Sequence, residues 1–147
     1  MADKVIAYHF LRNDFRSGSG TEPPWAVGET RSLKDGRIVP CERGYHGSPS
    51  LFDALQYAPG SISCMVELSV SVKPHGTPTN KYAARKRTLV AAVNIERDLR
   101  LFAADCAEHV LTLFETRYPD DTRPRLAIAA ARAYARGEIG AAARAAA

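Results

Sequence analysis

The amino-acid composition of the chain changes abruptly near Asn94, and this change limits the folds that it can adopt. Seven of the nine prolines and most of the glycines lie before this point, whereas 15 alanines and no lysine lie after it. Proline and glycine favour turns, and alanine is the strongest helix former. The sequence therefore predicts an α+β fold, with a β-rich domain over residues 1–93 and an antiparallel helical hairpin over residues 94–147. We expect the hairpin to dock on the first domain as one structural unit.

The first domain is expected to be a small, mostly antiparallel sheet with one packed helix. Residues 5–11 are rich in β-branched and aromatic side chains, which favour a strand. Apolar and polar residues alternate over 65–72, which is typical of a strand with one buried face, and residues 88–93 predict a further buried strand. The Asp35-Gly36 pair predicts a hairpin turn between residues 30–33 and 37–39, because a type I′ turn needs positive φ at both central residues.

Residues 44–58 have the pattern of a short strand, a glycine turn and a helix. Ser48 can cap the first N–H groups of that helix, and Pro49 suits its first position, so the helix is predicted to run to about Ala58. Backbone N–H groups at a helix start attract anions. His46 would then lie beside a bound phosphate or ribose. The alternative is that His46 is an ordinary strand residue and that Gly47 only permits the turn.

The C-terminal part is predicted to form two antiparallel helices. Asn94 can cap the first, in which one narrow stripe of apolar residues is expected to be buried. A turn over residues 119–124 would separate it from a second helix over about 125–136, whose small alanines allow two backbones to approach closely. The stripe consists of Leu99, Phe102, Cys106, Val110 and Leu113.

The cysteines and the apolar runs indicate the cellular compartment in which the protein is expected. The three cysteines, Cys41, Cys64 and Cys106, are odd in number and form no C-x-x-C motif, so we expect neither a disulfide framework nor a metal site. No apolar run reaches the roughly 20 residues of a membrane-spanning helix, and the N-terminus lacks the core of a signal peptide. We therefore expect a cytoplasmic protein without a membrane partner.

Positive charge suggests an anion-binding surface. The net charge is +4, and part of the surplus lies in the tract over residues 81–87. Such a tract can attract phosphates, although it can equally be a solvated face. The arginines of the last helix suit bidentate contacts, but they could instead pair with a polar arc on the preceding helix, formed by Asp105, Glu108, Thr112 and Glu115. The candidate ligand-binding residues are His46, Ser48, Lys81, Arg85, Arg87, Arg123, Arg125, Arg132 and Arg136.

The glycine-aromatic strand over residues 44–47 and the helix after it resemble the second motif of ADP-ribosyltransferase-type folds. The resemblance implies that the histidine–tyrosine–glutamate signature of that family falls on His9, Tyr57 and Glu96. It implies that the histidine binds the nicotinamide ribose of NAD, that the tyrosine stacks on the nicotinamide and that the glutamate stabilises the oxocarbenium ion. His9 is followed by Phe10, where that family has a glycine and a small hydroxyl residue. Catalysis, with NAD as its cofactor, is therefore the alternative and not the leading hypothesis.

The whole chain is similar to a group of small phage, prophage and actinobacterial proteins with a Gly-Tyr-His-Gly-Ser module, and its C-terminal pattern over residues 100–139 is similar to immunity-type proteins. The resemblance implies a non-catalytic accessory protein without a cofactor, which sequesters or blocks a host protein or an anionic nucleotide-like ligand. An anti-defence role inside the host cytoplasm is one such function. A nucleic-acid-binding accessory protein that uses the basic tract is a third hypothesis. Leu101 and Leu111 suggest a homodimer face.

Overall fold

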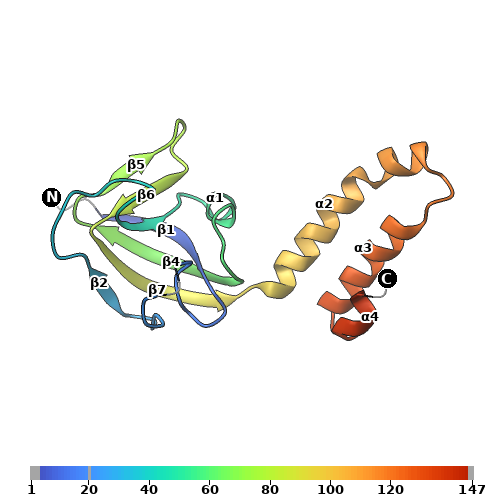
Figure 1. Ribbon diagram of the computed structural model, residues 1–147, viewed down its shortest axis with the longest axis horizontal. Helices are drawn as coiled ribbons and strands as arrows, with labels where there is room; N and C mark the ends of the chain where they lie inside the picture. Colours follow the sequence, from blue (N-terminus) through green and yellow to red (C-terminus); the bar gives the residue numbers. More distant parts are fainter. Residues whose placement is uncertain (1–3, 20, 146–147) are drawn as a thin grey trace. The chain divides into compact units, whose positions relative to one another are not determined.

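The computed structural model describes residues 4–19 and 21–145. The chain divides into two compact units, of which the first ends at Asn94 and the second begins at Ile95. Within the described residues, the strands and one short helix belong to the first unit and the remaining helices belong to the second (Figure 1). The predicted α+β class is confirmed.

The elements of the first unit are β1 (Lys4–Leu11), β2 (Thr30–Ser32), β3 (Tyr45–Gly47), α1 (Leu51–Leu55), β4 (Ile62–Ser69), β5 (Lys73–His75), β6 (Lys81–Ala84) and β7 (Lys86–Asn94). The elements of the second unit are α2 (Glu96–Arg117), α3 (Arg123–Ala135) and α4 (Ala141–Ala145).

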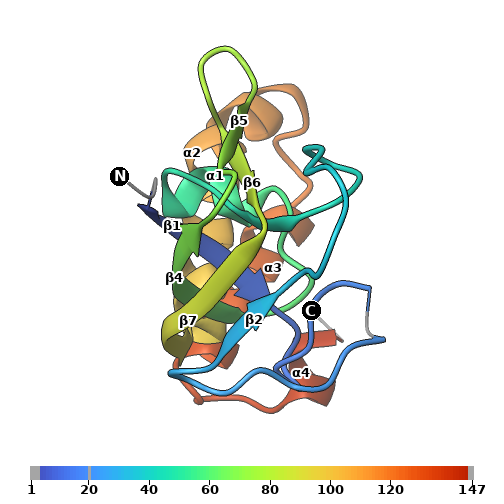
Figure 2. The ribbon, with the colours of Figure 1, turned by 90° about the vertical axis from the view of Figure 1, so that its left-hand side faces the viewer.

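The strands of the first unit form two antiparallel sheets. The larger has the order β1-β4-β7-β2 (Figure 2). The smaller has the order β3-β6-β5. The alternation predicted for β4 is confirmed, since Val66 and Leu68 are buried whereas Met65 is exposed. Apolar side chains of β1, β4 and β7 form the core together with Trp25.

A pair of backbone hydrogen bonds joins the two sheets at one point. The N–H of Tyr8 in β1 donates to the carbonyl of Ser48 at 2.8 Å, and the N–H of Ser48 donates back to Tyr8 at 2.7 Å. Ser48 directly follows β3, so this bridge brings the middle of β1 beside the end of β3. It thereby places His9 and His46 in the same part of the fold.

The predicted hairpin at Asp35-Gly36 is wrong. Gly36 does have a positive φ of 90°, but β2 pairs with β7 instead of with the residues that follow it. Thr30 lies opposite Thr88, a residue far along the chain. A long-range strand partner has therefore replaced the local one, which leaves residues 33–38 as a loop.

The predicted start and end of the first helix need correction. Ser50, rather than Ser48, is the N-cap of α1, and its Oγ accepts a hydrogen bond from the N–H of Asp53 at 3.1 Å. Ser48 cannot act as the cap because its backbone pairs with Tyr8 and the residue is buried. The helix ends at Leu55, three residues before the predicted end at Ala58.

In the second unit, α2 and α3 lie side by side and antiparallel, as expected (Figure 1). The N-cap of α2 is Ile95, and Asn94 instead ends β7, so the predicted cap is wrong. Among the residues of α2, Ala104 and Leu111 are buried. Burial of Leu111 removes it from the homodimer face suggested by the sequence. No helix in the described part of the chain is long and apolar enough to cross a membrane.

The apolar stripe that was expected to be buried on α2 is largely exposed. The exposed fractions are 46% for Phe102, 53% for Val110 and 77% for Leu113, and Cys106 is also exposed. The physical reason is the alanine content of α3. Small side chains on both helices allow close approach, so the packed face of α2 is the one that carries Ala104.

Candidate functional site

Two cavities of the first unit meet at His9 of β1 and His46 of β3. We call the smaller one, of about 150 Å³, the tyrosine cavity, because Tyr57 and Tyr8 line it. We call the larger one, of about 410 Å³, the arginine cavity, because Arg87 lines it. Both histidines line both cavities. The Tyr8–Ser48 bridge described above is what holds these two strands together.

Arg87 is the most unusual side chain of the arginine cavity. It lies on β7 and is only 3% exposed, although the sequence suggested a surface tract. Its guanidinium group lies over the rings of Trp25, at 4.3 Å, and Tyr45, at 5.1 Å. It donates hydrogen bonds to the carbonyl of His46 at 3.2 Å and to Oγ of Ser17 at 3.3 Å. Burial lowers the pKa of Arg87 to about 10, so the group remains a buried cation at neutral pH.

A second arginine lies over the same tryptophan but is fully paired. The guanidinium carbon of Arg31 is 4.1 Å from the ring centre of Trp25. Its nitrogens form ion pairs with Glu29 at 2.6 Å and with Glu22 at 3.2 Å. Glu22 also accepts from the indole N–H of Trp25 at 3.1 Å. The two carboxylates of this cluster therefore both contact Arg31 directly.

The two histidines are neutral groups. Burial, followed by the charges of Arg87 and His46, lowers the pKa of His9 well below its ordinary value of 6.5. Burial, followed by Lys81, Arg87 and His75, lowers the pKa of His46 to about 4. The Nε2 atom of His46 accepts a hydrogen bond from the N–H of Cys41 at 3.2 Å, whereas the Nε2 atom of His9 is buried without a partner.

The predicted anion site at the start of the first helix is not formed as expected. Ser48 is buried and its N–H is used in the bridge to Tyr8. The side chain of Ser50 already satisfies the N–H of Asp53, and α1 has only five residues. His46 does line a cavity, but its neighbours there are Lys81 and Arg87 rather than an open helix start.

The basic tract does not present its charges on one surface. The Nζ atom of Lys81 lies 3.4 Å from the ring centre of Tyr57. Arg85 donates to the carbonyls of Lys34 and Gly36, and Arg87 is buried. The continuous cationic face that nucleic-acid binding would use is therefore absent from this tract. Strand geometry explains this, because successive side chains point to opposite faces.

The structure brings two of the three predicted transferase residues together. His9 and Tyr57 both line the tyrosine cavity. Glu96 is the first residue of α2, in the second unit, and its carboxylate forms an ion pair with Arg100 at 2.6 Å. A glutamate in the first turn of a helix and four residues before an arginine is well explained by the helix itself.

The predicted arginines of the hairpin are all paired with carboxylates of the second unit. Arg125 forms two hydrogen bonds with Glu115, and Arg132 contacts both Asp105 and Glu108 at 2.6 Å. The sequence left two alternatives for these arginines, ligand binding or pairing with the polar arc of α2. The structure shows that Arg125 and Arg132 pair with this arc. The two remaining pairs are Arg123 with Asp121 and Arg136 with Glu138.

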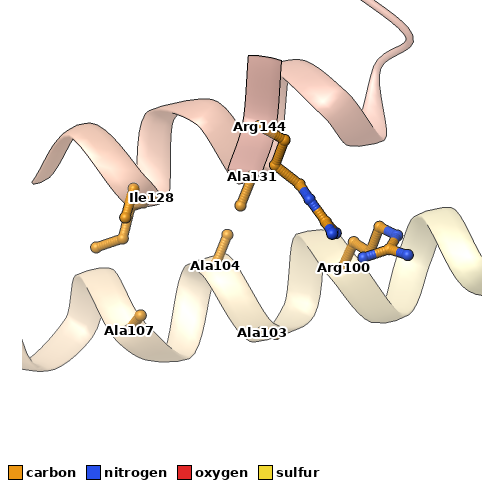
Figure 3. A pocket seen from close by; sticks show the side chains of 8 residues that line it. Arg100, Ala103, Ala104, Ala107, Ile128, Ala131 and Arg144 are labelled. Atoms are coloured by element: carbon orange, nitrogen blue, oxygen red, sulfur yellow. The ribbon is translucent and has the colours of Figure 1, made fainter. Parts of the chain in front are cut away.

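A groove of about 290 Å³ lies between the helices of the second unit. Figure 3 shows Ala104 of α2 facing Ala131 of α3, with Arg100 and Arg144 at one end. Both guanidinium groups also lie over the ring of Tyr134, at 4.9 and 4.8 Å. The groove is thus an apolar depression with a cationic end.

Sequence reasoning missed Tyr45 and Ser17, which line the arginine cavity, and Trp25, whose ring lies against Arg87. One signal was present, because Trp25 is the single tryptophan of the chain and lies in a loop that is otherwise polar and rich in proline and glycine. A tryptophan in such a loop is normally buried against something specific. In the part of the chain that the structure describes, no three histidine, cysteine or acidic side chains gather as metal ligands.

Comparison with known proteins shows that two segments of the chain match protein families. Residues 91–147 match the family described as "Imm-5 like putative immunity protein", which confirms the expected resemblance of the C-terminal part to immunity-type proteins. No curated protein and no solved structure matches the chain. The phage and ADP-ribosyltransferase resemblances stay predictions. Residues 5–101, more than half of the chain, match the family "Domain of unknown function (DUF7666)", and the protein therefore belongs to this family.

Proposed function

We propose that this protein is a non-catalytic binding protein of the immunity type, which blocks a partner protein through the exposed apolar stripe of α2. The carrying observation is that the immunity-type match covers the same residues that form the hairpin. If the partner is a host defence protein, this blocking action would amount to the anti-defence role that the sequence suggests.

The shape of α2 supports this surface. Phe102, Val110 and Leu113 recur at helical spacing on one face, about 130° from the face that packs against α3, at about 100° per residue. An amphipathic helix that keeps its apolar stripe exposed is suited to lie in a groove of another protein. Packing against α3 supports α2, and the ion pairs between the two helices lie on a different side of α2 from the apolar stripe.

The charge at one end of the stripe indicates the chemistry of the partner. Arg117 lies on the same face, one turn after Leu113, and its side chain contacts the ring of Tyr118. Among the described residues, no carboxylate is within ion-pair distance of Arg117. The proposed partner is therefore a protein that offers an apolar groove with a carboxylate at the Arg117 end.

The experiment has two steps. A photo-crosslinking amino acid at position 110 identifies the protein that contacts the stripe in cells, and the purified pair is then measured by calorimetry. We expect Val110→Asp to weaken binding by about 2 kcal/mol or more, because it places a charge in an apolar contact. Thr112→Asp is the matched control, since it adds the same charge to the same helix about 160° away from Val110.

The outcome against the proposal is equally definite. If Val110→Asp and Leu113→Asp bind the crosslinked protein as tightly as the original chain, the stripe is not the contact surface. Circular dichroism of each variant distinguishes lost binding from lost helix.

Catalysis is the second candidate, and the shared cavity of His9 and Tyr57 favours it. Two contacts oppose it. Lys81 covers the ring of Tyr57, where a nicotinamide would stack, and the carboxylate of Glu96 pairs with Arg100. The test is incubation with NAD, followed by chromatography for free nicotinamide. Release that is lost in Tyr57→Ala and in Glu96→Gln would favour the enzyme, and absence of release would leave the binding function.

A further inference from the structure

The buried charge of Arg87 has no direct counterion in the described residues. Glu22 and Glu29 contact Arg31, and neither is within ion-pair distance of Arg87. The charge of Glu22 raises the pKa of Arg87 from a longer distance but forms no ion pair with it. A guanidinium group has five N–H donors, and the described residues accept two of them, through His46 and Ser17. Burying a cation without a paired anion is costly, so such a group usually has a ligand or a partner.

A second polar group on the wall of the same cavity has no partner. The Nε2 atom of His9 is buried, makes no hydrogen bond, and belongs to a side chain that lines the arginine cavity. Fewer than one in ten buried polar groups are left in this way, and each calls for an explanation. The orphaned nitrogen and the unpaired guanidinium group belong to residues of different strands, β1 and β7, which both line the arginine cavity.

The rest of the cavity wall supplies hydroxyl groups. Ser19 and Thr21 line it, together with Gly18. Glu22 lines it as well, but its carboxylate already accepts hydrogen bonds from Trp25, Arg31 and Ser17. The volume of about 410 Å³ is that of a small-molecule site.

We propose that the arginine cavity binds a phosphomonoester, with the phosphate on the guanidinium group of Arg87 and within hydrogen-bond reach of His9. Nothing in the immunity-type function depends on this site, so the two proposals stand or fall separately.

A phosphate fits this wall better than a carboxylate does. It offers three acceptor oxygens, whereas a carboxylate offers two. The donors come from three directions: β7 with Arg87, β1 with His9, and the loop with Ser19 and Thr21. A neutral histidine carries one N–H, and the tautomer with its proton on Nε2 donates to a phosphate oxygen.

Binding in the arginine cavity can be measured through the fluorescence of Trp25. This residue is the only tryptophan, and the guanidinium group of Arg87 lies 4.3 Å from its ring centre. The full-length chain is titrated with ribose 5-phosphate, with ribose and with acetate, and the tryptophan fluorescence is followed. We expect a saturable change with ribose 5-phosphate alone. A response to acetate that equals it would overturn the phosphate assignment, and no response to any of the three would overturn the site.

Variants then locate the phosphate. His9→Phe replaces the imidazole with an aromatic ring that has no nitrogen, and Arg87→Lys keeps the charge but not the fork of donors. We expect each to weaken ribose 5-phosphate binding by about tenfold or more. Lys86→Ala is the control, because Lys86 is the exposed neighbour of Arg87 on β7.

Lost binding in His9→Phe would not be explained by unfolding, because this substitution removes an unsatisfied buried atom and should leave the chain at least as stable as before. If His9→Phe and folded Arg87→Lys both bind ribose 5-phosphate with the original affinity, the proposal is wrong.

Discussion

His9 and His46 make the stability of the first unit dependent on pH. Both have a pKa that burial lowers, to about 4 for His46 and well below the ordinary value for His9. In the unfolded chain each would take up a proton near pH 6.5. Between pH 6.5 and about 4 the unfolded state therefore binds more protons than the folded state, and stability falls as the pH falls.

We expect the free energy of unfolding to decrease by about 1–2 kcal/mol from pH 7 to pH 5, with solvent screening at the half-buried His46 taken into account. Urea unfolding at several pH values measures this. His46→Gln should reduce the slope, because glutamine can still accept from Cys41 but does not titrate. An unchanged slope in His46→Gln would contradict the burial argument.

The orphaned nitrogen of His9 predicts a stabilising substitution. Because Nε2 is buried without a hydrogen bond, its desolvation is uncompensated in the folded chain. His9→Phe keeps an aromatic side chain and removes that cost, so we expect the free energy of unfolding to rise by about 1 kcal/mol. Thermal unfolding at pH 7 measures it. A decrease would mean that the nitrogen has a partner, such as an ordered water.

Glycine is required at one place where β3 meets the core. A Cβ atom at Gly47 would lie 2.9 Å from Cβ of Ala7 and 3.2 Å from Cγ2 of Val66. Gly47→Ala should therefore destabilise the first unit by about 1–3 kcal/mol through overpacking. Gly140→Ala is the matched control, since a Cβ there would meet nothing within 4 Å. Denaturant unfolding compares the two, and equal stabilities would show that β3 can shift away from β1.

Elements with local signals were predictable and elements with distant partners were not. The strand-like composition of residues 5–11 and the alternation over 65–72 correspond to β1 and β4, because burial of one sheet face imposes that pattern. The Asp35-Gly36 turn failed since β2 takes its partner from β7. The apolar stripe of α2 has helical spacing, but its expected burial is wrong, because periodicity shows which residues share a face and not whether that face is covered.

The candidate site was only partly predictable for a similar reason. The residues 44–47 gave His46 and the basic tract gave Arg87, each from local sequence. The arginine cavity also depends on Ser17, which is 70 residues from Arg87 along the chain, and on Trp25. No spacing rule links such positions. The burial of Arg87 could not be read from the tract, whose charges look alike in sequence.

At the scale of the whole molecule, the two units differ in how their stability arises. The first has a connected core that includes Leu11, Val66, Leu68 and Leu89. Among the described residues of the second, only Ala104 and Leu111 are classed as buried, and its ion pairs lie on exposed surfaces. Water screens exposed ion pairs, so they add little to so small a core.

This difference predicts the order in which backbone amides lose protection. Hydrogen exchange with mass-spectrometric readout, in increasing urea, should show α2 and α3 opening at lower denaturant than β1, β4 and β7, because less apolar area is buried around them. Arg132→Ala, which removes the contacts to Asp105 and Glu108, should lower the protection of α2 and α3 further and leave the strands unchanged. A partner bound to the stripe should have the opposite effect and protect α2, since ligands stabilise the form that they bind. Simultaneous opening of helices and strands at one urea concentration would contradict this, and would mean that the hairpin draws its stability from more than its own core.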